Sequence, residues 1–279
     1  MTENNKNNIP LVSVLIPVYN EAYNPLLSDT INSIIEQTYP NIELVLIDDA
    51  STDNSISIIL EILNSHKTRF KRTRIIKNSQ NMDIANSLNN GIKECYGEYI
   101  ARLDIGDFMH RDRLSLQLEH LQTRKNVWLV GSFSIFIDEK KNLINRSRLF
   151  FPKTGHYSDI SKVSLYRNFI PHSTWLIKKE LFNKIGSYDS NYRCEDYEFW
   201  LRALSKNYLV EIIPRNLTYV LISEHAGISW LNKKTMQISM AKMKLKYINN
   251  FLSIPNIIGV LKTLIGLITT YKNNIIRKN

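Results

Sequence analysis

Residues 98 to 107 read Glu-Tyr-Ile-Ala-Arg-Leu-Asp-Ile-Gly-Asp, and this stretch is the best guide to the fold. Its first half has the composition of a buried strand, which runs directly into a turn that carries Asp104 and Asp107. Much further along the chain, Glu195 and Asp196 open an amphipathic segment. Acidic side chains in a turn can hold a cation against a diphosphate, and a separate carboxylate can accept a proton from an attacking group. Together these features indicate an enzyme that handles a phosphorylated substrate.

The size and composition of the chain are those of a globular protein with a sizeable core. Its 279 residues, 43% of them hydrophobic, suffice for one large α/β domain or for a domain with an appendage. Two cysteines, Cys95 and Cys194, are too few for a disulfide framework or a zinc site and fit a reducing cytosol. The polar first ten residues contain no signal peptide, so we do not expect export.

Positive charge is concentrated toward the C-terminal end. The net charge is +10, and nine Lys or Arg but no Asp or Glu follow Glu224, which leaves about +1 (10 − 9) for the preceding part. A nucleic-acid-binding function would therefore depend on this tail alone. The tail contains no recognisable nucleic-acid-reading motif, and we expect no nucleic-acid partner.

Apolar runs alternate with helical spacings through the first half of the chain. The pattern predicts strands over residues 12–18, 42–47, 74–76 and 99–103. Helices are predicted over residues 26–37, from the N-cap residues 51–53 to Leu63, and over 84–92. This alternation is typical of an α/β fold with a mostly parallel sheet, which binds ligands at the carboxyl ends of its strands.

Acidic residues follow three of the predicted strands: Glu21, the pair Asp48-Asp49, and Asp104. We expect them to converge on one crevice. The second half is less regular. There, residues 128–137 and 143–151 are predicted as paired strands, residues 171–175 as the entry to a short strand, and residues 197–204 as a helix.

These motifs, taken together, resemble those of family 2 glycosyltransferases of the GT-A fold, and the chain is similar to bacterial enzymes that build O-antigen or capsule repeats. The matching stretches occur in the family's order over about residues 11–230 and comprise residues 17–21, 48–55, 88–92, 97–104, Arg113-Leu114 with Gln117, and 195–202. The resemblance implies a Rossmann-like, mostly parallel central sheet with flanking helices over residues 1–230. Residues 231–279 would then form a basic amphipathic helical tail.

The resemblance also implies that a nucleotide-sugar donor lies across the first strand ends. Pro17, Tyr19 and Glu21 would frame the base and the ribose, with a packed aromatic as the alternative for Tyr19. Asp49, or its neighbour Asp48, would accept a hydrogen bond from the base. Because an aspartate accepts well from the ring N–H of uracil, a UDP-sugar is the expected donor.

At the end of the fourth strand, the resemblance implies contacts to the donor from Arg102 and Asp104, with a structural ion pair as the alternative for Arg102. The family usually has Asp-x-Asp-Asp at the metal turn, whereas this chain has Gly106 in the third position. Asp104, Asp107 and His225 are the candidate ligands of a Mg²⁺ or Mn²⁺ ion. The alternative is a cation-free enzyme, in which cationic side chains and helix N-termini stabilise the diphosphate.

Asp196 matches the position of the family's catalytic base. An inverting transfer needs a base that removes the proton of the acceptor hydroxyl, on the face of the sugar opposite the leaving diphosphate. The alternative is that Glu195 and Asp196 stabilise the N-terminus of the following helix, and both roles are compatible. His172, beside Pro and Ser, is interpreted as a packing residue, with a contact to a sugar as the alternative.

The basic tail has two apolar stripes at helical spacing, separated by Pro255. The first contains Met236, Met240, Met243, Tyr247 and Phe251, and the second contains Ile257, Leu261, Leu264 and Ile268. Its densest apolar run is too short to span a bilayer. The composition favours the surface of an anionic membrane, and the alternative is a helix packed on the body with its lysines in solvent.

The sequence therefore predicts an inverting glycosyltransferase that transfers a sugar from a nucleotide-sugar to a lipid-linked saccharide in bacterial surface polysaccharide synthesis. We expect it in the cytoplasm, peripherally bound to the inner face of the cytoplasmic membrane. The alternative function is a non-catalytic nucleotide-sugar-binding or membrane scaffold that lost its chemistry with the second acid of the metal turn.

Overall fold

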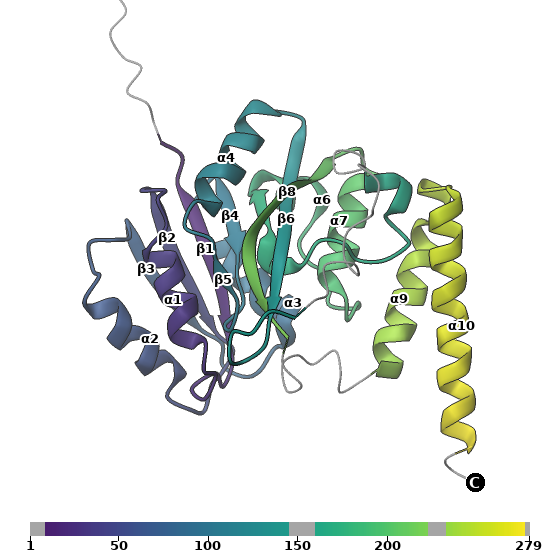
Figure 1. The fold of residues 1–279 in the computed structure, drawn as a ribbon, viewed down its shortest axis with the longest axis horizontal. Coiled ribbons are helices and arrows are strands. Elements are labelled where there is room, and N and C mark those ends of the chain that lie inside the picture. Colours follow the sequence, from purple (N-terminus) through teal and green to yellow (C-terminus); the bar gives the residue numbers. More distant parts are fainter. Residues whose placement is uncertain (1–8, 145–159, 223–232, 277–279) are drawn as a thin grey trace, which may run out of the picture.

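A computed structural model describes residues 9–144, 160–222 and 233–276, with side chains described for 9–144, 160–222 and 235–270. A curved mixed sheet forms the centre of the molecule, with helices on both of its faces (Figure 1). The sheet has eight strands in the order β3-β2-β1-β4-β7-β6-β8-β5. The predicted α/β fold with a mostly parallel central sheet and flanking helices is confirmed.

The first half of the chain forms the parallel part of the sheet. Strands β1 (Val12–Val18), β2 (Ile42–Asp48), β3 (Arg72–Lys77) and β4 (Tyr99–Arg102) are parallel to their neighbours. They alternate with the helices α1 (Leu27–Ile35), α2 (Ser55–Asn64) and α3 (Asp83–Glu94). These elements were all predicted, and their bounds differ from the predictions by only a few residues.

The second half of the sheet is assembled from distant segments: β5 (Phe108–Met109), β6 (Val127–Ile137), β7 (Leu176–Lys178) and β8 (Leu209–Leu221). Strand β7 is antiparallel to both β4 and β6. Strand β6 runs parallel to β8 along most of its length. The helices of this half are α4 (Arg113–Thr123), α6 (Glu180–Ile185) and α7 (Glu195–Ser205).

The predicted pairing of residues 128–137 with 143–151 is found at the start of the second segment, which is the part that the structure describes. An isolated antiparallel bridge between Ile137 and Leu143 is the contact found there, and residues 145–151 lie outside the described residues. The principal partner of β6 is β8, about 80 residues further along the chain. Local spacing predicts neighbouring hairpins, but it contains no information on a partner so distant in sequence.

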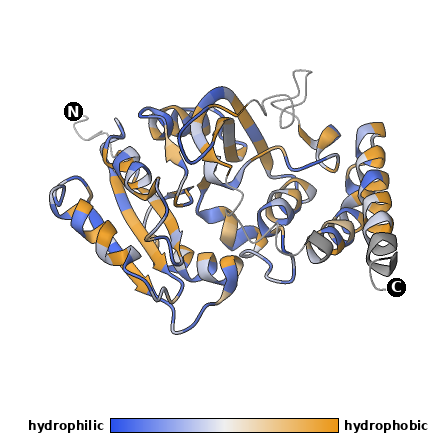
Figure 2. Cartoon of the chain, turned by 60° about the horizontal axis from the view of Figure 1, so that its bottom comes forward, coloured by the Kyte–Doolittle hydropathy of each residue, from blue (hydrophilic) through white to orange (hydrophobic). Residues whose placement is uncertain are grey.

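Alternation along the strands divides the apolar residues between two cores. Leu15 and Val45 face one side of the sheet, which α3, α6 and α7 cover. Val14 and Leu44 face the other side, which α1, α2 and α4 cover. Strands β1 and β2 are buried on both faces and are therefore mostly hydrophobic (Figure 2), whereas the edge strand β3 is partly exposed.

The C-terminal segment folds as a helix pair, α9 (Lys233–Tyr247) and α10 (Ile254–Ile276), with a 3₁₀ turn η3 (Ile248–Asn250) between them. The two helices lie side by side at the end of the molecule away from β3 (Figure 1). Met243 and Tyr247 of α9 belong to the core that α7 covers. Pro255 lies in the first turn of α10, where its missing N–H costs no helical hydrogen bond. The apolar stripe of α9 is therefore turned toward the body of the protein.

Helix α10, in contrast, exposes apolar side chains along its length. Asn256 and Val260 are buried against the body, and Leu264 packs against the same core. The exposed stripe of α10 consists of Ile254, Ile257, Ile258, Leu261, Ile265 and Ile268, which are between 41% and 76% accessible. Among the described residues, no helix is both long and apolar enough to cross a bilayer.

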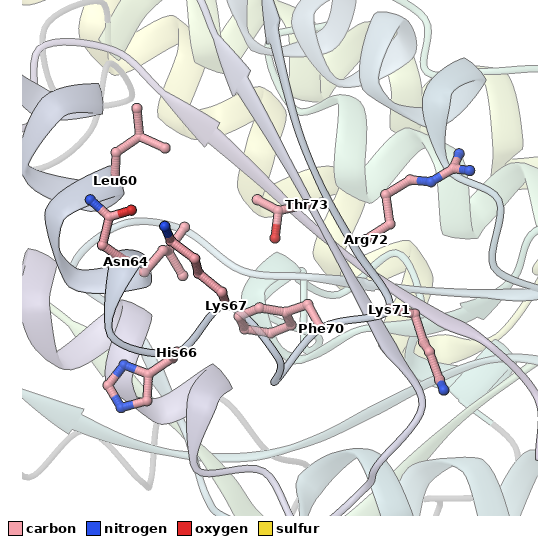
Figure 3. Close-up of a pocket in the computed structure, with 9 residues that line it drawn as sticks. Leu60, Asn64, His66, Lys67, Phe70, Lys71, Arg72 and Thr73 are labelled. Atoms are coloured by element: carbon pink, nitrogen blue, oxygen red, sulfur yellow. The ribbon is translucent and has the colours of Figure 1, made fainter.

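A hollow of about 310 Å³ opens between the end of α2 and the beginning of β3 (Figure 3). Its lining includes His66, Lys67, Lys71 and Arg72. This hollow lies at the amino end of β3, on the edge of the sheet opposite the strand ends that carry the predicted acidic residues. It is therefore separate from the candidate active site.

Candidate active site

The loops that follow β1 and β2 are joined to each other. The backbone N–H of Glu21 donates to Ser55 Oγ (2.7 Å), and that of Ala22 donates to Asp53 Oδ2 (2.9 Å). Asp53 Oδ1 also accepts the N–H of Ser55 at the beginning of α2 (3.0 Å). Asp53, which precedes the N-cap residue Asn54, thus binds the first N–H of the helix and joins the two loops. The predicted N-cap at residues 51–53 lies one residue too early. Pro17 is half-buried at the end of β1, and Tyr19 beyond it is 46% exposed.

Asp48 and Asp49 are both buried but have different partners. Asp48 Oδ1 accepts the N–H of Ser51 (2.7 Å) and so closes its own turn. Asp49 Oδ1 accepts from Asn78 Nδ2 (2.7 Å) and from the N–H of Met82 (3.0 Å), which lie between β3 and α3. These bonds hold the Asp49 carboxylate between two loops through its Oδ1. The second oxygen of Asp49, Oδ2, is therefore a better candidate to bind a ligand than that of Asp48, which faces Lys77.

A partly buried ion pair lies at the end of β4. Arg102, 5% exposed, pairs with Asp104, whose side chain is 43% exposed. Ser173 Oγ lies between them, accepting from Arg102 Nη1 (3.0 Å) and donating to Asp104 Oδ2 (3.2 Å). Burial acts to lower the pKa of Arg102, but the carboxylates of Asp104 and Asp107 raise it overall. Arg102 is therefore a permanent positive charge beneath Asp104.

Arg113 and Gln117 of α4, both completely buried, hold this part of the sheet together. Arg113 Nη2 donates to the carbonyl oxygens of Arg102 (3.2 Å) and Trp175 (2.9 Å). Gln117 Nε2 donates to the carbonyl oxygen of Thr174 (2.7 Å). These bonds satisfy backbone groups where β4 meets the 3₁₀ turn η2 (His172–Thr174), so the motif that contains them is structural.

The turn after β4 requires a glycine. Gly106 has φ +98°, and a Cβ at this position would lie 2.8 Å from Leu221 Cδ2 and 3.1 Å from Asn24 Nδ2. Its N–H donates to Thr30 Oγ1 (2.9 Å). Asp107 is 6% exposed, and its Oδ1 accepts the N–H of Leu221 (2.8 Å), which ties the turn to β8. Gly106 thus reflects the close packing of this turn.

The described residues do not complete a metal site. The exposed carboxylate of Asp104 can supply one oxygen, but it is paired with Arg102, and Asp107 is bonded to a backbone N–H. Within residues 9–144, 160–222 and 235–270, no group of three His, Cys, Asp or Glu could hold a metal ion. His225, the third predicted ligand, lies outside the described residues. A cation here would need further oxygen ligands, such as those of a diphosphate.

Glu195 and Asp196 form the first turn of α7. Glu195 is 7% exposed, and burial together with the Asp196 carboxylate raises its pKa to about 8. Burial also raises the pKa of Asp196, although the N–H of Tyr197 and the Asn168 amide oppose the shift. Asp196 Oδ2 accepts from Asn168 Nδ2 (2.8 Å). A raised pKa suits a carboxylate that takes up a proton near neutral pH.

Several predicted residues from different strand ends are within electrostatic range of one another. The charges of Arg102 and Asp104 act on both Glu195 and Asp196. Asp104 also contributes to a raised pKa of Glu21, for which burial is the largest cause. The structure thus brings the base candidate, the end of β4 and the loop after β1 close to one another.

His172 is a packing residue rather than an exposed contact. It is 9% exposed, and its ring lies 4.4 Å from that of Trp175. Its Nε2 is 2.9 Å from the hydroxyl of Tyr188, and burial lowers its pKa well below the usual value. Asn89 in turn holds Tyr188 by two 2.9 Å bonds to its backbone.

Two polar residues of the site were not recognised from the sequence. Ser173 bridges the Arg102–Asp104 pair, and Asn168 contacts Asp196. Both lie between residues 160 and 175, where no motif or periodicity distinguishes a site residue from its neighbours. Only the folding of this segment between β4 and α7 gives them their partners.

This fold, with acidic residues after its parallel strands, is that of a glycosyltransferase. The family model "Glycosyl transferase family 2" matches residues 13–186, and the chain belongs to this family. Three relatives, all described as glycosyltransferases, illustrate the similarity. An uncharacterised one from Haemophilus influenzae is 31% identical, with 85% of each chain covered, and MJ1057 of Methanocaldococcus jannaschii is 28% identical, with 75% of this chain and 69% of the relative covered. The amylovoran biosynthesis protein AmsE of Erwinia amylovora is 27% identical, with 80% of this chain and 79% of the relative covered.

Solved structures share the fold. The mannosyltransferase PcManGT from Pyrobaculum calidifontis, in complex with GDP-Man and Mn²⁺, has a TM-score of 0.68 at 20% identity, with 92% of this chain and 70% of that chain covered. TarS of S. aureus in complex with UDP-GlcNAc has a TM-score of 0.62 at 16% identity, with 91% and 71% covered. The chain therefore has a GT-A fold, and it is a glycosyltransferase by its family.

Proposed function

We propose that the protein is an inverting glycosyltransferase that transfers a sugar from a UDP-sugar to a lipid-linked saccharide in the synthesis of a bacterial surface polysaccharide, such as O-antigen or capsule. The observation that carries the proposal is the position of Asp196. This carboxylate belongs to a residue that is only half-buried, it has a raised pKa, and it lies within electrostatic range of Arg102 and Asp104 at the end of β4. The similarity to AmsE supports polysaccharide synthesis as the setting.

In the proposed donor complex, the second oxygen of Asp49 accepts the ring N–H of uracil. Pro17, Tyr19 and Glu21 border the base and ribose, and the exposed ring of Tyr19 is free to pack on them. Arg102 contributes through Asp104, because its guanidinium is buried and paired. The complex of TarS with UDP-GlcNAc supports a uridine donor, while that of PcManGT with GDP-Man makes GDP-sugars the first alternative.

In the proposed reaction, the acceptor hydroxyl oxygen forms a bond to the anomeric carbon while the bond from that carbon to the diphosphate breaks. Asp196 takes the hydroxyl proton, and the nucleoside diphosphate leaves with the bonding electron pair. Asn168 donates to Asp196 Oδ2, so the other carboxylate oxygen is the one to receive the proton. General-base assistance of this kind contributes about 10²–10⁴-fold to the rate.

A Mg²⁺ or Mn²⁺ ion on the diphosphate is part of the proposal, with Asp104 as the ligand that this chain supplies. Asp107 and His225 are the further candidates. Such an ion would neutralise charge on the leaving group. The Mn²⁺ in PcManGT supports this cofactor, and the pairing of Asp104 with Arg102 supports weaker binding than at a turn with two free acids.

A panel of nucleotide sugars, incubated with the full-length protein with and without EDTA, tests the function. We expect release of the nucleoside diphosphate from a UDP-sugar, at a rate that EDTA lowers in part. Release from a GDP-sugar alone would reject the uridine assignment. Nucleotide-sugar binding without any turnover, in the presence of detergent-solubilised membrane extract as the source of acceptor, would favour the scaffold alternative.

For the acceptor, we propose that the exposed stripe of α10 rests on the inner face of an anionic membrane. The stripe lies in a segment with nine basic and no acidic residues, so its charge is complementary to anionic lipid and opposed to a second copy of itself. The partly buried face of α10 excludes insertion of the whole helix without unpacking it from the body. This location would bring the site to lipid-linked saccharides.

Vesicle flotation tests the membrane contact. The full-length protein should bind phosphatidylglycerol vesicles and ignore phosphatidylcholine vesicles, and the binding should fall with salt without vanishing, because apolar contacts are not screened. Ile265→Glu should abolish binding, whereas Leu60→Glu, at an exposed apolar position on α2, should not. A dimer that Ile265→Glu disrupts, with no vesicle binding, would identify the stripe as a subunit interface instead.

A further inference from the structure

Asn168 has a fixed orientation next to the proposed base. Its Oδ1 accepts two hydrogen bonds, from Trp200 Nε1 (3.2 Å) and from the N–H of Ile170 (3.2 Å). Two N–H donors on one side of the amide require the oxygen there. The Nδ2 group must therefore face Asp196, to whose Oδ2 it donates at 2.8 Å. A hydrogen bond donated to a carboxylate favours its ionised form and fixes its rotamer.

The segment that carries Asn168 is held by the C-terminal helices. Asn256 of α10 is completely buried, accepting the N–H of Leu165 (2.7 Å) and donating to the carbonyl oxygen of Ser161 (2.8 Å). A Cβ on Gly259 would lie 2.3 Å from Leu165 O and from Tyr166 Cα. Helix α10 therefore crosses this segment in direct backbone contact, at a position where only glycine fits.

Lys244 joins the three elements. Although it is a lysine, it is 2% exposed, and its Nζ donates to Thr263 Oγ1 (2.9 Å) and to the carbonyl oxygens of Gly259 (3.2 Å) and Tyr166 (3.3 Å). Burial lowers its pKa to about 8. An ammonium group satisfied by neutral oxygens from α10 and from the Asn168 segment acts as a fixed three-way connector.

Helix α7, which carries Asp196, is bonded both to the segment that carries Asn168 and to α9. The hydroxyl of Tyr197, directly after Asp196, donates to the carbonyl oxygen of Ser164 (2.5 Å). Glu198, completely buried, accepts from the Tyr247 hydroxyl (2.7 Å) and pairs with Lys246 of α9 (3.2 Å). Both sides of the contact between Asn168 and Asp196 thus depend on packing against α9 and α10.

We propose that Asn168 is a positioning residue, which orients the Asp196 carboxylate and keeps it ionised, and that α9 and α10 hold Asn168 in place for this task. The inference rests on the proposed function, in which Asp196 is the base. It also gives the C-terminal helices a role in the reaction itself, in addition to any contact with a membrane. Catalytic contact with the substrate is left to Asp196.

Other groups also act on the charge of Asp196. Glu195 lies beside it on α7, and Arg102 and Asp104 face it from the end of β4. Further titratable neighbours are Tyr188, Cys194 and Tyr197. Arg102 favours the ionised form, whereas the acidic groups oppose it. The contribution of Asn168 must therefore be separated from theirs by a double-mutant cycle rather than read from one variant.

The experiment compares urea unfolding of wild type, Asn168→Ala, Asp196→Asn and the double variant at about pH 5 and about pH 9, and needs no substrate. The bond to an ionised Asp196 is lost as pH falls through the pKa of this carboxylate, which burial raises above its usual value. Asn168→Ala should therefore raise the unfolding constant about tenfold more at high pH than at low pH. In the Asp196→Asn background its cost should not depend on pH. A cost that is independent of pH in wild type as well would overturn the proposal.

A second variant covers a failure of Asn168→Ala to fold. Asn168→Asp keeps the size of the side chain and an acceptor for Trp200 but replaces the donor by an acid, so it should also destabilise more at high pH. The role of α10 is tested with Asn256→Ala. This substitution should reduce the coupling energy between Asn168 and Asp196 that the double-mutant cycle measures. The exposed Ile265→Ser on the same helix is its matched control and should leave the coupling unchanged. Equal coupling in both would reject the role of α10.

Turnover distinguishes this inference from the proposed function. On the nucleotide sugar that the panel selects, Asn168→Ala should lower kcat about tenfold at neutral pH with little change in KM, and should shift the acid limb of the pH profile upward. If Asp196→Asn keeps full transfer while the unfolding cycle shows coupling, the base assignment fails and the contact is only structural. If Asp196→Asn is inactive but Asn168→Ala has a wild-type profile, the inference alone fails.

Discussion

The donor side and the base side of the site are built in different ways. On the donor side, Glu21, Asp49 and Asp53 make their hydrogen bonds within loops that follow adjacent parallel strands. On the base side, Asp196 depends on Asn168, whose segment is in turn held by Asn256 and Lys244 from the last two helices. The first is a local structure repeated strand by strand, and the second is an assembly of three distant segments.

This difference predicts which property a substitution on each side will alter. A change on the donor side should affect nucleotide affinity and little else, because its contacts end within the loops that follow β1, β2 and β3. A change on the base side should affect turnover together with stability, because the same groups fill the core between α7, α9 and α10. The following variants test this division, in order of decreasing expected effect.

Asp196→Asn should lower transfer by about 10²–10⁴-fold, because the amide cannot accept the acceptor proton. The affinity for UDP, measured by calorimetry, should stay near that of wild type, since no predicted nucleotide contact is altered. Transfer within tenfold of wild type would exclude Asp196 as the base. A loss of UDP affinity instead would show that the two sides are not independent.

Gly106→Asp would restore the usual acid of the metal turn, but it should destabilise the fold rather than improve cation binding. The left-handed backbone costs a side-chain-bearing residue about 1–2 kcal/mol, and overlap with Leu221 and Asn24 adds about 1–3 kcal/mol. A lower urea midpoint checks this. Gly106→Ala, which adds the Cβ without the charge, is the matched control and should lower the midpoint as well. Unchanged stability with tighter Mn²⁺ binding would contradict the geometry of this turn.

Asp49→Ala should weaken the binding of UDP and of the intact donor alike, by about 1.5–3 kcal/mol, or roughly 10–150-fold, if its free oxygen meets the base. Asn78→Ala removes a partner of Asp49 without removing the carboxylate and serves as the control, with a smaller expected effect. Calorimetry that finds equal affinities for wild type and Asp49→Ala would reject the contact, and the same measurement on Asp48→Ala would test its neighbour.

Glu195→Gln should stabilise the protein as pH rises. Burial and Asp196 raise the pKa of Glu195 from 4.5 to about 8, so between these values the folded state holds a proton that the unfolded state releases. The free energy of unfolding of wild type therefore falls with rising pH in this window, and the variant loses this dependence. Its gain in melting temperature should be small at about pH 5 and largest at about pH 8. The exposed Glu180→Gln should show no such trend.

Sequence reasoning located most of the donor side. The strands β1, β2 and β4 and the acids after them could be predicted, because parallel strands buried on both faces are apolar throughout and end in polar loops. The roles of Asp48 and Asp49 could not be separated, since adjacent aspartates look alike until their partners Ser51 and Asn78 are placed. The nucleotide and base roles of these residues stay predictions.

The base side was predicted only in part. Asp196 was selected by its motif, but Asn168 was not, because an asparagine in an irregular segment has no periodicity to distinguish it. The tail was predicted as two similar amphipathic stripes. The structure buries the stripe of α9 and exposes that of α10, and this difference follows from which face finds a partner rather than from composition.

The sequence by itself determined the α/β order of the first half, the positions of the strand-end acids and the membership of the family. These features are local, because strand periodicity and turn chemistry act over a few residues. Only the tertiary structure decided that β6 pairs with β8, that Gly106 is required by packing against Leu221, and that Lys244 connects α9, α10 and the segment before Asn168. Each of these features depends on contacts between residues far apart in the chain. The energy of such a contact depends on the distance between its atoms in space, which local sequence patterns do not predict.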